Sequence, residues 1–97
     1  MKYELKVERV DQIAQPLSEL QGVVSYLAYA GHPHLTTCIT LRRLNLDLFC
    51  DNIAELNACI VIAKRYLKSD WRRNLTKGYV DGHGKYYCIS YTFYTDL

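Results

Sequence analysis

Two histidines and a cysteine lie close together in the spacing His32-x-His34-x-x-x-Cys38. Imidazole and thiolate groups are zinc ligands, and Cys50 would supply a fourth. His32 and His34 point to opposite sides if the segment is extended, however, and the chain has no Cys-x-x-Cys pair. We therefore expect a polar turn that leads into a strand with a packed Cys38, with no metal site and no cofactor.

A nucleophilic thiol is the second chemistry to consider, because a cysteine becomes reactive beside a base and positive charge. His83 could supply the base, but no local pattern marks an activated cysteine, and Cys59 lies among isoleucine and valine. We expect no enzymatic activity. The cysteines are expected to be free thiols in a reducing cytoplasm; they are Cys38, Cys50, Cys59 and Cys88.

Nine tyrosines are many for 97 residues, and several fall on one predicted strand near the C-terminus. An exposed row of tyrosines can stack unpaired bases while nearby cations contact phosphates. The alternative is that alternate tyrosines fill the core, and the aromatic motifs of RNA-recognition domains are absent. The candidate residues for binding single-stranded nucleic acid are Arg72, Arg73, Lys77, Lys85, Tyr87 and Tyr91.

Acidic residues form a second candidate surface. Asp47, Asp51 and Glu55 are spaced i, i+4, i+8, which places them along one side of a helix. Asp11 and Glu19 add a shorter acidic line. A rigid row of carboxylates can imitate the phosphates of DNA and bind a protein that binds DNA. The competing interpretation is a charged, solvent-facing stripe.

Hydropathy indicates the elements that hold these residues. Alternation over Lys2–Arg9 predicts a strand with one solvated side. Asp11 is a candidate helix N-cap and Pro16 fits a first turn, so a first helix is expected over about Gln15–Ala30, with Gly31 as its stop.

Alternation from Leu35 to Leu41 predicts a second strand. A long helix then begins at Asn45 or Asp47 and ends near Leu67, because apolar residues recur every three or four positions. The remaining predicted elements are a short helix over Ser69–Arg73, a hairpin turn at Asp81–Gly84 and a closing strand over Lys85–Tyr94.

Together these elements predict one α+β domain over residues 1–97. We expect a three- to four-stranded, mostly antiparallel sheet with two main helices and one short helix packed on one face. The longest apolar run, Ala58–Ala63, is far shorter than the roughly 20 residues of a membrane span. The N-terminus has no apolar signal region, so a cytoplasmic protein is expected.

Charge is divided along the chain. Five Lys/Arg and seven Asp/Glu up to Ile60 give −2, whereas seven and three from Val61 onward give +4. Opposed fields of this kind steer macromolecular partners. We therefore expect a protein that binds another macromolecule, and neither a membrane nor a small-molecule substrate.

Over its whole length the chain resembles small phage- or prophage-encoded anti-CRISPR proteins of the type I-F group. The resemblance runs from MKYELKVERVDQIAQPLSELQ through DNIAELNACIVIAKRYLKSDW to GKYYCISYTFYTDL. It implies a non-enzymatic inhibitor in a bacterial host cell. Such a protein binds the DNA-entry subunits of the type I-F CRISPR–Cas surveillance complex and blocks target DNA.

The resemblance also gives the acidic residues a role. Asp47, Asp51 and Glu55 would act as a local DNA mimic, with Asp11 and Glu19 beside them. DNA mimics are usually strongly acidic, whereas this chain has a net charge of +2. The basic segment after Val61 would then face away from the cleft or contact an acidic or RNA surface.

Overall fold

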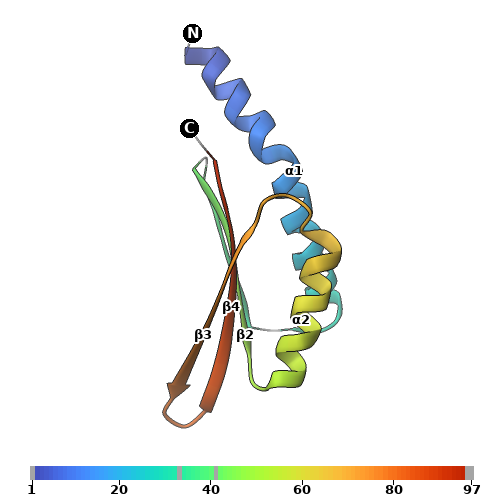
Figure 1. The fold of residues 1–97 in the computed structure, drawn as a ribbon, viewed down its shortest axis with the longest axis vertical. Coiled ribbons are helices and arrows are strands. Elements are labelled where there is room, and N and C mark those ends of the chain that lie inside the picture. The colour runs from blue at the N-terminus through green and yellow to red at the C-terminus, as the bar shows by residue number, and fades with distance from the viewer. Residues whose placement is uncertain (1, 33, 41, 96–97) are drawn as a thin grey trace.

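The structure is a computed structural model that describes residues 2–32, 34–40 and 42–95, with side chains from residue 13 onward. Its elements are α1 (Lys2–Tyr29), β1 (Leu35–Ile39), β2 (Arg43–Cys50), α2 (Ile53–Tyr66), β3 (Arg72–Val80) and β4 (Gly84–Tyr94). Figure 1 shows two layers, because both helices lie over one face of the sheet and the other face has no helix. The predicted α+β class is confirmed.

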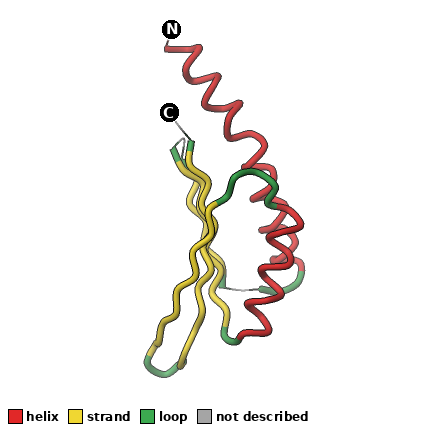
Figure 2. Tube along the Cα trace, viewed as in Figure 1, coloured by secondary structure: helices red, strands yellow, loops and turns green. Residues whose placement is uncertain are grey.

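The sheet has four strands in the order β1-β2-β4-β3, and all neighbouring pairs are antiparallel. Figure 2 shows the β3–β4 hairpin extending beyond the helices at the end away from both termini. The predicted hairpin turn at Asp81–Gly84 is confirmed. Gly82 and Gly84 have φ of 83° and 100°, which glycine adopts without the steric cost of a side chain.

The first element is a helix, so the strand predicted over Lys2–Arg9 is wrong. Asp11 and Pro16, expected at a helix start, both lie inside α1. The alternation of charged and apolar residues over Lys2–Arg9 is too short to distinguish the period of a strand from that of a helix. Over a longer window the apolar residues recur every three or four positions, at Tyr3, Val7, Val10, Ile13, Leu17 and Leu20.

The segment expected to begin the long helix forms β2 instead. Leu44, Leu46, Leu48 and Cys50 are fully buried and alternate with more exposed residues, which is the period of a strand with one buried side. The helix begins eight residues later than Asn45. Asn52 caps α2, because its Oδ1 accepts a hydrogen bond from the Glu55 backbone N–H at 2.8 Å.

The short helix predicted over Ser69–Arg73 is absent from the described structure. α2 ends at Tyr66, and β3 begins at Arg72. The connection is held by α1, because the Ser69 backbone N–H and the Trp71 Nε1–H both donate to Glu19 Oε1, at 2.9 and 2.8 Å. Glu19 thus satisfies the Ser69 backbone N–H, and the Trp71 backbone N–H donates to the Ser69 carbonyl at 2.8 Å, so the connection needs no helical turn.

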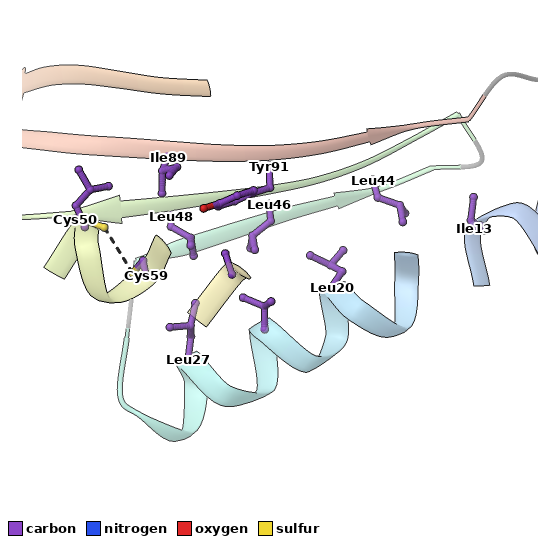
Figure 3. Packing of buried hydrophobic residues seen from close by; sticks show 13 residues of the cluster. Ile13, Leu20, Leu27, Leu44, Leu46, Leu48, Cys50, Cys59, Ile89 and Tyr91 are labelled. Carbon is purple, nitrogen blue, oxygen red and sulfur yellow. Dashed lines mark hydrogen bonds between the residues drawn. The ribbon is translucent and has the colours of Figure 1, made fainter. Parts of the chain in front are cut away.

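The core lies between the helices and the sheet, as Figure 3 shows. Leu20, Val23 and Leu27 of α1 face the leucines of β2, while Cys59 and Ala63 of α2 complete the layer. Ile89 and Tyr91 add the contribution of β4. All four cysteines are free; Cys38 is exposed and the other three are buried. The expected packing of Cys38 is therefore wrong, because β1 is a sheet edge.

Candidate nucleic-acid interface

β3 is an exposed, basic edge strand. Every residue of β3 is exposed except the half-buried Gly78, because the helices pack mainly over β2 and β4. The sequences of β3 and β4 contain no Asp or Glu. Their four cations, Arg72, Arg73, Lys77 and Lys85, therefore have no acidic neighbour on either strand.

Cations and aromatic rings alternate on the helix side of the hairpin. The register pairs Lys77 with Tyr87, Tyr79 with Lys85 and Arg73 with Tyr91. Directly opposed residues in an antiparallel pair share a face, and Lys77 Nζ lies 5.9 Å from the centre of the Tyr87 ring. We define the hairpin face as Arg73, Leu75, Lys77, Tyr79, Lys85 and Tyr87.

Tyr79 and Leu75 are the members of the hairpin face that the sequence prediction did not include, and Tyr79 is the aromatic one. Its side chain is 68 % exposed, more than Tyr94 at 50 %, and it lies two residues from Lys77. The signal was present, because side chains two positions apart share a face once the segment is a strand. The sequence prediction placed a short helix over Ser69–Arg73, and so it did not predict a strand that contains both Lys77 and Tyr79.

Arg72 lies on the opposite face from Arg73. Its guanidinium carbon is 5.3 Å from the centre of the Tyr94 ring on the uncovered side of the sheet. Neighbouring strand residues always point to opposite sides, so Arg72 and the hairpin face cannot contact one ligand strand in the same way.

Tyr91 belongs to the core and not to an exposed row of tyrosines. It is 6 % exposed, and its hydroxyl has no hydrogen-bond partner among the described residues. Burial raises the pKa of the Tyr91 hydroxyl, and the nearby Arg73 guanidinium opposes part of that rise. A ring in this position is unable to stack a base.

A hollow of about 410 Å³ lies at the distal half of the hairpin. Lys77, Tyr79, Lys85 and Tyr87 line it from the hairpin face, together with Gly78 and Tyr86. The Tyr86 ring lies across Gly78 so closely that an added Cβ would overlap it. Two cations and two tyrosine rings of the hairpin face therefore line the hollow, and the Tyr86 ring belongs to the opposite face of the same hairpin.

The predicted acidic stripe along one helix is wrong. Asp47 lies on β2, Asp51 lies in the turn after it, and Glu55 lies in the first turn of α2. The spacing i, i+4, i+8 aligns residues only within a helix. Asp47 lies within the sheet, where it accepts hydrogen bonds from the Ser90 hydroxyl (2.6 Å) and the Thr36 hydroxyl (3.3 Å).

Asp51 and Glu55 remain near the surface, each beside a histidine. Asp51 Oδ1 is 2.6 Å from His83 Nε2, and both side chains are about half exposed, at 49 % and 48 %. Glu55 Oε1 is 3.1 Å from His32 Nε2. Each of these two carboxylates contacts a histidine, and they do not form a continuous row with Asp47.

Glu19, expected at a partner surface, is buried at 6 % exposure. Its carboxylate accepts hydrogen bonds from Ser69, Trp71 and Gln15. Burial by itself would raise the pKa of Glu19, but the hydrogen bonds to the charged form outweigh it and lower the pKa below 4.5. Glu19 therefore stabilises the fold. Asp11 lies within α1, and its side chain is outside the described part of the chain.

The histidines and cysteines are grouped differently from the sequence prediction. His34 and Cys38 are exposed, whereas His32 lies beside Cys50 and Cys59, with ligand atoms all within 4.8 Å of one another. His83 contacts Asp51 rather than a thiol. Burial raises the pKa of Cys50 to about 12, with the neighbouring Cys59 and Glu55 adding to the rise. A thiol with a raised pKa is not an activated nucleophile.

Comparisons of this chain with protein-family models, curated proteins and solved structures return no match. Within the described residues, no helix is both long and apolar enough to cross a membrane.

Proposed function

We propose that this protein is a non-enzymatic binding protein that holds single-stranded nucleic acid against the hairpin face. The observation behind the proposal is the alternation of Lys77 with Tyr87 and of Tyr79 with Lys85 on one exposed face. Cations that follow a phosphate backbone and rings that stack bases are the two parts of sequence-independent single-strand recognition.

The burial pattern favours a ligand at this face over one on the open side of the sheet. The open side is cross-linked by its own polar groups, since Ser90 donates to Asp47 and the Thr92 hydroxyl donates to Asn45 at 2.7 Å. The hairpin face instead presents exposed cations with no carboxylate on either strand. Bare cations release counterions when phosphates replace those ions, which favours binding.

A single strand fits better than a duplex. Duplex bases are stacked on one another, so tyrosines contribute to binding only where bases are unpaired. Stacking on an aromatic side chain stabilises the complex by about 1–3 kcal/mol per base. Tyr79, the most exposed ring of the face, is therefore expected to contribute most.

Fluorescence anisotropy with a labelled oligodeoxythymidine tests the proposal. We expect a Kd on the order of 10 µM near physiological salt, the range of electrostatic, sequence-independent binding. Lys77→Glu/Lys85→Glu should weaken binding at least about tenfold. Arg65→Glu is the matched control, because Arg65 is exposed on α2 away from the hairpin. Equal affinity of the double variant and the wild type would contradict the proposal.

The inhibitor function implied by the sequence resemblance is a second proposal. This proposal can no longer rest on a helical row of carboxylates. Asp51 and Glu55 are still partly exposed at one end of the molecule, with side chains 49 % and 30 % exposed. A pull-down with a type I-F surveillance complex, followed by competition with target DNA, tests it. The inhibitor proposal is favoured if the wild type captures the complex, Asp51→Lys/Glu55→Lys does not, and Lys77→Glu/Lys85→Glu still does.

A further inference from the structure

Three elements that are distant in sequence converge on one buried point. His32 lies in the connection between α1 and β1, Cys50 is the last residue of β2, and Cys59 lies on α2. Their potential ligand atoms all lie within 4.8 Å of one another. Figure 3 shows the side chains of Cys50 and Cys59 directed toward each other across the interface between sheet and helix.

The separation of the two sulfurs matches that of a shared metal ion. Cys50 Sγ and Cys59 Sγ are 3.8 Å apart. Two sulfurs bound to one tetrahedral zinc ion at about 2.3 Å each are separated by about 3.8 Å. A disulfide needs a separation of about 2.05 Å, so the observed distance requires no movement for a metal and a large movement for a covalent bond.

His32 provides an independent indication of a missing ligand. Its side chain is only 7 % exposed, and its buried Nε2 has no hydrogen-bond partner among the described residues. Its other ring nitrogen, Nδ1, accepts a hydrogen bond from the His34 backbone N–H at 3.3 Å. Glu55 Oε1 lies 3.1 Å from this nitrogen, but the two groups are not aligned for a hydrogen bond. Buried polar atoms are nearly always satisfied, so an orphaned ring nitrogen beside two thiols points to an absent partner.

A cleft provides a route from solvent to this point. It has a volume of about 440 Å³, and its lining includes His32, Glu55 and Cys59. The Glu55 side chain is 30 % exposed, compared with 7 % for the His32 side chain that it contacts. A hydrated cation can therefore reach the thiols and lose its water beside a carboxylate.

We propose that His32, Cys50 and Cys59 bind one Zn²⁺-like cation, with Glu55 turning inward to the fourth position. Two thiolates and an imidazole select zinc over magnesium or calcium, which prefer oxygen ligands. Coordination through His32 Nε2 requires the ring proton on Nδ1, so the hydrogen bond from the His34 backbone N–H to Nδ1 is given up. The two thiol protons pass to the solvent, and no electron is transferred. The ion joins the α1–β1 connection to β2 and α2. The site adjoins the hairpin face, because Cys50 is the cross-strand partner of Tyr87. None of its proposed ligands belongs to that face, so the metal proposal does not rest on the proposed function.

Cobalt titration of the reduced, chelator-treated full-length protein tests the site. We expect one Co²⁺ per chain, a thiolate-to-cobalt charge-transfer band and the ligand-field bands of tetrahedral cobalt, all lost when Zn²⁺ is added. Cys59→Ala and His32→Gln should each weaken Co²⁺ binding by more than about 100-fold, since even loss of an outer-shell partner costs about 10–100-fold. Cys38→Ala and His34→Gln, the matched controls outside the cluster, should change it less than about threefold.

Three results would overturn the proposal. The first is a wild-type protein without the charge-transfer band, and the second is a folded Cys59→Ala variant that binds Co²⁺ as tightly as the wild type. The third is a Cys38→Ala control that loses as much Co²⁺ affinity as Cys59→Ala. Circular dichroism establishes whether each variant is folded. If Cys59→Ala fails to fold, the wild-type band still decides the matter, because it reports sulfur ligation directly and needs no variant.

Discussion

Glu19→Gln probes the contact that fixes the connection between α2 and β3. The Glu19 carboxylate accepts four hydrogen bonds. Oε1 accepts from the Ser69 backbone N–H (2.9 Å) and Trp71 Nε1–H (2.8 Å), and Oε2 accepts from the Ser69 hydroxyl and the Gln15 amide, both at 3.0 Å. Glutamine is nearly isosteric, but its amide nitrogen is a donor and cannot accept the last two bonds.

The cost follows from the number of bonds lost. Hydrogen bonds to charged groups contribute about 1.5–3 kcal/mol each, and the two bonds that Gln retains become neutral and weaker. Because the Ser69 hydroxyl can turn to another acceptor, we expect Glu19→Gln to lower the free energy of unfolding by about 2–4 kcal/mol. For a domain of this size that lowers Tm by roughly 10–20 °C.

The same contact makes stability depend on pH. The folded-state pKa of Glu19 is lowered below 4.5, so its contribution is complete above the pH at which the unfolded carboxyl ionises. The contribution is lost as pH falls through the folded-state pKa. Glu19→Gln should therefore destabilise the protein at pH 7. On acidification from about pH 5 to roughly below pH 4, the variant should lose less stability than the wild type.

Thermal unfolding followed by circular dichroism at several pH values measures both effects. Asp70→Asn is the matched control, because Asp70 is an exposed carboxyl in the same connection; its free energy of unfolding should change by less than about 0.5 kcal/mol. A Glu19→Gln variant as stable as Asp70→Asn at pH 7 would refute the reasoning.

Two further substitutions test the hairpin. Gly78→Ala should destabilise the protein by about 1–3 kcal/mol in urea unfolding, because the new methyl group overlaps the Tyr86 ring. Thr76→Ala on the same strand is the control. Equal losses of stability in the two variants would contradict the close approach of the Tyr86 ring to Gly78. Tyr91→Phe should change the free energy of unfolding by less than about 1 kcal/mol, because the buried hydroxyl makes no well-aligned hydrogen bond and its polar neighbour is the exposed Arg73 guanidinium. It should also leave oligonucleotide affinity unchanged, and a loss of affinity would place Tyr91 in the interface.

The hairpin turn and the closing strand were predictable, whereas the start of α2 and the strand β3 were not. A glycine-rich turn flanked by β-branched and aromatic residues predicts the β3–β4 hairpin, and the alternation over Lys85–Tyr94 gives the correct faces of β4. The error over Arg43–Cys50 arose because Phe49 lies four residues before Ile53 and so extends the helical spacing backward. The alternation of buried and more exposed residues over Arg43–Cys50 has the period of a strand instead. The Asn52 cap marks the boundary between β2 and α2, and the sequence prediction did not include it.

The sites were less accessible to sequence reasoning. Spacing along the chain predicts neighbours only within one element, which is why Asp47, Asp51 and Glu55 do not form a row. The burial of Tyr91 depends on how the helices cover β4, and no local pattern reports that. His32 and Cys59 are 27 residues apart in sequence and meet only because the sheet brings separate elements together.

The salt dependence of oligonucleotide binding tests the hairpin face most directly. If Arg73, Lys77 and Lys85 each neutralise one phosphate, the logarithm of the association constant should fall against the logarithm of salt concentration with a slope of about −2. Lys77→Glu/Lys85→Glu should reduce that slope to about −0.7, and Arg65→Glu should leave it unchanged. A slope near zero, or the same slope in the wild type and the double variant, would contradict nucleic-acid binding at this surface.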